Sequence, residues 1–134
     1  MGAKWQNGVA EGAIRTVVSK ARTLMIHAAL HWPEEEDETL WPLALTHAAH
    51  LFNHTPGEMN GIAPFEIFAS QVSDHKVIKS AHTWGSPVYV LEPRLTTAEG
   101  KVPKWQPRSR RGQYVGASPQ HAENIALVRN LKTG

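Results

Sequence analysis

The sequence lacks cysteine and long apolar runs, and both absences narrow what the protein can be. Without cysteine there are no disulfides, no Cys-type zinc sites and no thiol catalysis. No apolar run approaches the roughly 20 residues that a membrane-spanning helix needs. The first residues also lack the apolar segment of a signal peptide. We therefore expect a soluble intracellular protein with no membrane partner.

Acidic residues are scarce at both ends of the 134-residue chain. Residues 1–32 carry four Lys or Arg and one acid. Residues 33–99 carry three Lys or Arg and ten acids, and residues 100–134 carry seven Lys or Arg and one acid. Basic segments can bind polyanions such as nucleic acid, because neutralising phosphates releases counterions. A solvated basic surface is the alternative.

The hydrophobic content of 41% is enough to build a core.

Apolar residues at three- and four-residue steps predict helices in the first half of the chain. The first runs from about residue 8 to about 31, with Asn7 as its N-cap. The acidic run 34–38 follows and is expected to be a solvated loop. A second helix begins near Thr39 and ends at the breaker 53–57, and a short third helix follows Pro64.

The second half of the chain has a different character. Residues 71–81 are predicted to be a connector, and turn-rich segments then separate three short runs typical of β-strands. These predicted strands are residues 87–91, 112–116 and 125–129. The sequence therefore predicts an α+β protein with a helical part followed by a small β-barrel or sheet.

Glu11 is the candidate catalytic carboxylate. Enzymes that cut or join phosphodiesters often use two divalent metals held by a few carboxylates. Glu11 lies in the first turn of the predicted helix, with Arg15 and Arg22 further along the same face, where they could meet phosphate. The plain alternative is an acid stabilised by the helix dipole.

The residues around Glu11 strengthen the catalytic interpretation. The run Trp5-Gln6-Asn7-Gly8-Val9-Ala10-Glu11 resembles the last active-site segment of the integrases of copia-type LTR retrotransposons, where the pattern is Gln-Asn-Gly-any-Ala-Glu-Arg. Further segments resemble the helices that close the integrase core and the SH3-like module after it. They are Leu40-Trp41-Pro42, Asn53-His54-Thr55-Pro56, Gly61-Ile62-Ala63-Pro64-Phe65-Glu66-Ile67-Phe68, Trp84-Gly85-Ser86-Pro87-Val88-Tyr89-Val90 and Arg110-Arg111-Gly112-Gln113-Tyr114-Val115-Gly116.

This resemblance covers nearly the whole chain and implies its organisation. Residues 1–70 would be the helical C-terminal part of an RNase H-like catalytic core, residues 71–81 a linker, and residues 82–134 an SH3-like module that lacks its last strand. The core helices would normally pack on strands that are missing here. Their apolar faces would therefore be exposed, which implies self-association or a partner.

The resemblance also implies roles for individual residues. Glu11 would be the final member of an Asp-Asp-Glu triad that holds Mg²⁺ or Mn²⁺ in the complete enzyme. Two departures matter: the only aspartates, Asp37 and Asp74, lie downstream and do not match the triad, and Gly12 replaces the usual basic residue. We therefore expect no stably bound metal and no catalysis by this chain alone. Asn7, Arg15 and Arg22 would face DNA, and the parent enzyme would work in the nucleus.

Two other interpretations stay open. The chain could be a non-catalytic DNA-binding or assembly module, or a degenerate open reading frame without a function. The module depends on a basic stretch in which arginines could bind phosphates and Trp105 could stack on a base. Alternatively, that stretch is a solvated loop and Trp105 covers an open end of the barrel. Its candidate nucleic-acid-binding residues are Lys104, Arg108, Arg110 and Arg111.

Histidines and large aromatics receive structural interpretations. The spacings of His27 and His31, and of His47, His50 and His54, are compatible with zinc. No acid or cysteine completes either set, so we expect these histidines on polar faces or at helix ends. The large aromatics expected in the core or in domain contacts are Trp32, Trp41, Phe52, Phe65, Phe68 and Trp84.

Overall fold

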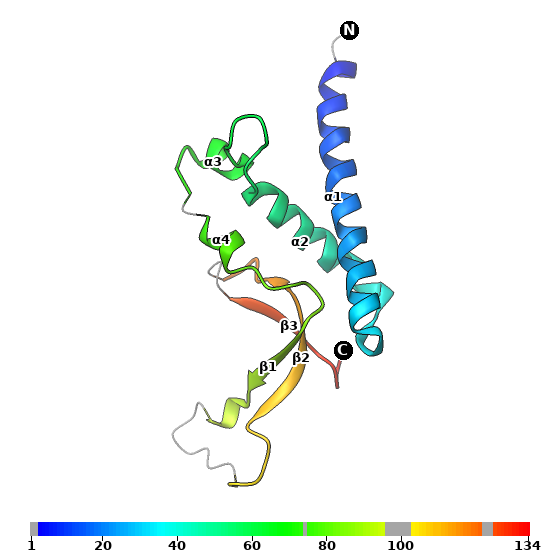
Figure 1. Ribbon diagram of the computed structural model, residues 1–134, viewed down its shortest axis with the longest axis vertical. Helices are drawn as coiled ribbons and strands as arrows, with labels where there is room; N and C mark the ends of the chain where they lie inside the picture. Colours follow the sequence, from blue (N-terminus) through cyan, green and yellow to red (C-terminus); the bar gives the residue numbers. More distant parts are fainter. Residues whose placement is uncertain (1–2, 74, 96–102, 122–124) are drawn as a thin grey trace.

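The computed structural model describes residues 3–73, 75–95, 103–121 and 125–134 (Figure 1). Within these ranges the protein is a mixed α+β structure, as predicted, with four α-helices and one three-stranded antiparallel sheet. None of the described helices is long and apolar enough to cross a membrane. The elements are α1 (Ala3–His31), α2 (Trp41–His54), α3 (Pro64–Ala69), α4 (Lys76–Lys79), β1 (Pro87–Leu91), β2 (Ser109–Ala117) and β3 (Ala126–Asn130).

Helix α1 begins earlier than predicted. It starts at Ala3, so Asn7 lies inside the helix and the prediction that Asn7 is the N-cap is wrong. Glu11 consequently lies beyond the first turn, which contains no acid, and its predicted place in that turn is also wrong. The physical reason is that nothing between Ala3 and Asn7 breaks a helix. The helix ends at His31, directly before Trp32 and Pro33.

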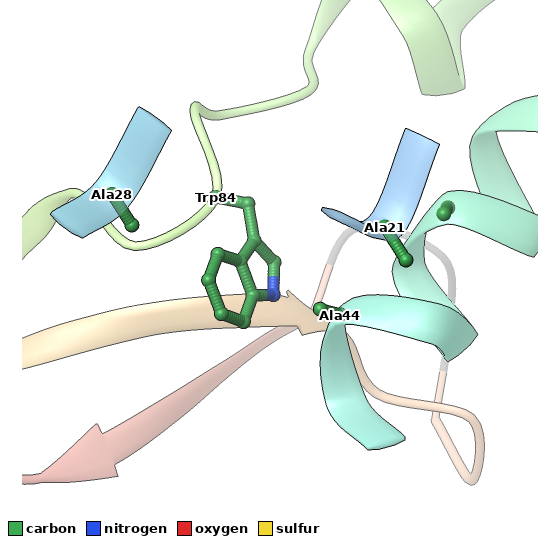
Figure 2. Packing of buried hydrophobic residues seen from close by; sticks show 5 residues of the cluster. Ala21, Ala28, Ala44 and Trp84 are labelled. Carbon is green, nitrogen blue, oxygen red and sulfur yellow. The ribbon is translucent and has the colours of Figure 1, made fainter. Parts of the chain in front are cut away.

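Helices α1 and α2 pack through small side chains. The buried cluster consists of Ala21 and Ala28 from α1, Ala44 and Ala48 from α2, and Trp84 from the segment before β1. Alanines let the two helices approach closely, and the indole of Trp84 lies among them (Figure 2). Trp84 is only 2% exposed, and its Nε1 donates a hydrogen bond to the carbonyl of Val115 on β2, at 3.2 Å. One side chain thus joins both helices to the sheet.

The sheet has the strand order β1-β2-β3, and all three predicted strands are present. Strand β2 is longer than predicted because its first residues pair with β1, with Tyr89 opposite Arg111 and Leu91 opposite Ser109. The predicted connector 71–81 contains the short helix α4. Strand β2 also packs on α2, where the ring of His47 meets the ring of Tyr114 edge-on at 5.8 Å. The helical part and the sheet are therefore in direct contact.

The prediction that the acidic run 34–38 is a solvated loop is only partly correct, because Glu34, Glu36 and Glu38 are exposed but the run is ordered. It forms two 3-10 turns, Pro33–Glu35 and Glu38–Leu40, and Glu35 is only 5% exposed. Asp37 caps the second turn, because its Oδ1 accepts a hydrogen bond from the amide of Thr39 at 2.9 Å. The run is ordered by partners on the sheet, which local sequence does not show.

The predicted aromatic core is only partly correct. Trp84 is buried, but Trp41 and Phe68 are 58% and 91% exposed, so their assignment to the core is wrong. More than half of each of these two side chains is exposed to solvent. The N-terminal half of α1 extends past α2 (Figure 1). It exposes Val9 and Ile14, which are 79% and 62% accessible.

Gly85 should be intolerant of any side chain. Its φ is +83°, and a Cβ added there would lie 2.5 Å from the Cβ of Ala28 on α1. We expect Gly85→Ala to lower the free energy of unfolding by about 3 kcal/mol, combining backbone strain with the clash. Urea unfolding followed by circular dichroism measures this change.

Gly12→Ala is the matched control for that substitution. Gly12 lies in the middle of α1 with nothing within 4 Å of an added Cβ. Alanine should therefore stabilise the protein by about 0.5–1 kcal/mol, because it restricts the unfolded chain and favours helix. Equal effects of the two substitutions would contradict the close approach of Gly85 to α1.

The histidines divide into two groups. In the last turns of α1 and α2, the Nδ1 atoms of His31 and His54 lie 2.9 and 2.8 Å from the carbonyls of His27 and His50, so their expected helix-end role is confirmed. His47 was expected on a polar face and is instead only 4% exposed, which makes that prediction wrong. Burial, followed by the nearby His50, lowers the pKa of His47 from 6.5 to about 4.

The low pKa of His47 predicts a loss of stability in mild acid. Its pKa is about 4 in the folded state and 6.5 as the ordinary value, so the unfolded chain takes up the proton first. The stability contributed by the neutral ring is complete above pH 6.5 and is lost as the pH falls towards 4, by at most about 1.4 kcal/mol per pH unit. Urea unfolding at several pH values between 4 and 6.5 measures this change. The free energy of unfolding should depend less steeply on pH in His47→Leu than in the unaltered protein. The exposed His31 provides the control, and His31→Leu should retain the slope.

Candidate nucleic-acid interface

Glu11, Arg15 and Arg22 lie on one face of α1. Their spacings of four and eleven residues correspond to about one and three helical turns, so the side chains share a face and Glu11 and Arg22 are about 17 Å apart along the axis. All three are exposed. Ala21 and Ala28, which pack on α2, lie on a different face of the same helix. Among the described residues, no ion pair involves any of the three.

The residues around Glu11 do not make a complete metal site. A divalent cation such as Mg²⁺ needs several oxygen ligands delivered to one point. No group of three or more His, Asp or Glu side chains within the described residues could hold a metal ion. Asp37 is already paired with Arg129, and Asp74 lies outside the described residues. Glu11 is therefore a single carboxylate with no described partner ligands.

A second set of candidate residues lies on the hairpin formed by β1 and β2. Lys104, Arg108 and Arg110 are exposed, and the Nζ of Lys104 lies 5.6 Å from the centre of the Trp105 ring. Trp105 is 90% exposed, so the alternative in which it covers an open end of the sheet is wrong. Its ring face remains accessible beside cationic side chains, which is the arrangement that binds nucleic-acid strands.

Arg111 differs from its exposed neighbours because it is paired with the acidic run. Its Nη2 lies 2.6 Å from Oε1 of Glu35 and 3.2 Å from Oε1 of Glu34. The carboxylate of Glu35 is almost fully buried, whereas Arg111 is 43% exposed. A buried carboxylate needs its cation. Arg111 was predicted to bind nucleic acid, and the structure places its guanidinium on Glu35.

Two residues that the sequence did not single out complete this contact. Arg129 Nη2 lies 2.6 Å from Oδ2 of Asp37. The hydrogen bonds from Thr39, followed by Arg129, hold the pKa of Asp37 below its ordinary value. Gln113 is only 2% exposed, and its Nε2 donates to the carbonyl of Glu35 at 3.2 Å. The run of five acids was the one signal in the sequence that could have indicated basic partners.

The structure does not bring all the candidate residues together. The start of α1 and the segment that leads into β2, residues 103–108, lie at opposite ends of the long axis of the molecule (Figure 1). The Glu11 face and the basic hairpin are therefore separate surfaces within the described residues. Only an extended ligand, such as a nucleic acid, could contact both surfaces at once.

No protein-family model matches the chain, and no solved structure matches it.

The pairing of Arg111 predicts a stability role that its neighbour lacks. Arg111→Ala would leave the buried carboxylate of Glu35 without its cation. We expect a loss of about 2 kcal/mol, reduced from the value for a fully buried pair because Arg111 is partly exposed. Urea unfolding at pH 7 measures the loss.

Arg110→Ala provides the matched control, since it removes the same charge from the adjacent, exposed position. Its effect on stability should stay within about 0.5 kcal/mol. If the two alanine variants unfold at the same urea concentration, the ion pair with Glu35 does not stabilise the fold.

Proposed function

We propose that this chain is the C-terminal portion of a copia-type retrotransposon integrase and that it binds DNA. On this proposal, residues 1–70 correspond to the helices that close an RNase H-like core, and residues 82–134 correspond to an SH3-like module. The Gln-Asn-Gly-any-Ala-Glu pattern lies within α1, and the Trp-Gly-Ser-Pro-Val-Tyr-Val segment leads into β1. The order of the matching segments along the chain supports the proposal.

The observation that carries this proposal is the exposed face of α1 with Glu11, Arg15 and Arg22. A carboxylate and two arginines on one helical face can serve a phosphodiester, because arginines bind phosphate oxygens and a carboxylate can share a metal. Glu11 would be the last of three carboxylates, and the other two would have to come from outside this chain. We therefore propose that the chain by itself does not catalyse strand transfer.

The exposed apolar surface agrees with a protein that has partners. Val9 and Ile14 on α1, and Ile67 and Phe68 on α3, are all more than half exposed. Large exposed apolar patches are typical of interaction sites. In the proposed context, strands of the complete core or a second copy of the chain would cover these faces, and the assembly would act on DNA in the nucleus.

A non-catalytic DNA-binding or assembly module is the second candidate function. It is favoured by one contrast: the exposed basic hairpin needs no metal, whereas Glu11 is not part of a metal-holding group within the described residues. Both candidates require DNA binding, and they differ only in whether Glu11 has a role. DNA binding is therefore the property to test first.

We expect the logarithm of the association constant for a 20-base-pair duplex to fall linearly with the logarithm of salt concentration. Each phosphate contact contributes about 0.9 to this slope. Arg108→Ala/Arg110→Ala should therefore lower the slope by about 2, and Arg15→Ala/Arg22→Ala should do the same. Fluorescence anisotropy at several salt concentrations provides the measurement.

Lys79→Ala/Lys132→Ala is the control for loss of charge, because it removes two exposed cations from other surfaces. It should change the slope by much less. Affinity that is undetectable at low salt, or equal losses in all three double variants, would contradict the proposed interface. Strand transfer with Mg²⁺ or Mn²⁺ and donor DNA should be absent, and turnover that disappears in Glu11→Gln would overturn the proposal that the chain is inactive alone.

A further inference from the structure

The distal half of the β1–β2 hairpin exposes aromatic and apolar side chains among cations. Trp105 is 90% exposed, Tyr89 is 74% exposed and Leu91 is 53% exposed. Lys104, Arg108 and Arg110 are exposed on the same hairpin. Large aromatics in water next to arginines are typical of binding surfaces. This combination offers flat apolar faces together with positive charge.

The hairpin holds these side chains on a regular framework. Tyr89 is opposite Arg111 and Val90 is opposite Arg110 in the register, so Tyr89 lies on the face of Arg111 and Arg110 lies on the other face. The amide of Glu92 donates to the carbonyl of Arg108 at 2.9 Å, which continues the pairing past the end of β1. The amide of Gln106 donates to the carbonyl of Pro103 at 3.0 Å and closes a turn around Trp105. Trp105 thus extends from a turn that leads into the paired backbone of β2.

The helices leave this half of the hairpin uncovered. Residues 112–116 of β2 are buried, whereas residues 103–111 are all exposed (Figure 1). Glu92 is the one acid among residues 87–95 and 103–117. The face that carries Arg110 is opposite the face on which the guanidinium of Arg111 binds the acidic run. Positive charge and ring faces both remain available to a ligand.

Unpaired bases fit this surface better than a duplex does. In a duplex the faces of the bases are hidden by stacking, so a protein reaches phosphates and groove edges. In a single strand each base offers a face to an aromatic ring, and such stacking changes the affinity by roughly five- to hundredfold per base. Arginines beside the rings bind the backbone phosphates in either case.

We propose that the hairpin binds a single-stranded stretch of DNA, with a base stacked on Trp105 and phosphates held by Arg108 and Arg110. The inference rests on the proposed function, because it assumes that this hairpin binds DNA. It adds that the surface selects DNA whose bases are unpaired.

Three probes of equal length separate stacking from charge: 20-nucleotide oligothymidylate, an abasic 20-mer and a 20-base-pair duplex. Fluorescence anisotropy of labelled probes with the full chain should give oligothymidylate an affinity at least tenfold above that of the abasic strand and of the duplex. Trp105→Ala should weaken oligothymidylate binding about tenfold and leave the abasic strand and the salt slope unchanged.

Trp41→Ala is the control, since Trp41 is also an exposed tryptophan, at 58%, but lies on α2. It should alter none of the three affinities. Equal binding of the oligothymidylate and abasic strands would overturn this inference and leave the proposed function standing, provided that the duplex also binds. Absence of binding to every DNA probe at low salt would remove both. Polyglutamate that binds as tightly as oligothymidylate would show that the surface takes acidic peptides and would also overturn the inference.

Discussion

The contact of Trp84 and Gly85 with α1 is the interaction on which the rest of the structure depends. Trp84 packs among alanines of both long helices and donates a hydrogen bond to β2. Gly85 follows with a positive φ and touches Ala28, so the chain passes directly over the helix before it enters β1. Four alanines alone bury little apolar surface, and the indole supplies most of the volume between the helices and the sheet. Without it, the sheet would have only the contacts of α2 and the acidic run to hold it.

Ion pairs with the acidic run form the second attachment of the sheet, and they divide the basic residues of the second half into two classes. Arg111 and Arg129 hold Glu35 and Asp37, and Gln113 binds the backbone between the two turns. Removing either arginine would leave a buried or half-buried carboxylate without its cation. None of the described ion pairs includes Lys104, Arg108 or Arg110. Charge count alone would assign the same role to all five cations.

Much of the fold could be predicted from local patterns, and two of the failures share one cause. Apolar periodicity located α2, Pro64 marked the start of α3, and short apolar runs between turns located the three strands. The start of α1, the order of the acidic run and the burial of His47 were missed. In the last two cases the deciding partners lie far along the chain: Glu35 meets Arg111, and His47 meets Tyr114. For the candidate site, the pattern around Glu11 located the exposed face of α1, but no local pattern could separate the paired Arg111 from the exposed Arg110.

The geometry of α1 allows one helix to serve a partner and a nucleic acid at once. Successive residues are about 100° apart around a helix, so the stripe of Ala10 and Ile14 is centred about 100° from the face of Glu11 and Arg15, with Ile14 next to Glu11 at the edge between them. The first pair continues the stripe that packs on α2 in the C-terminal half of the helix, beyond the point where α2 ends (Figure 1). A partner that covers this stripe would bury the exposed Ile14 and leave the acid–arginine face open. The same partner would also fix the direction of α1. Within the described residues, the N-terminal half of this helix is held in place through the packing of the C-terminal half. Binding of a partner and presentation of Glu11 would thus be linked through the rigidity of a single helix.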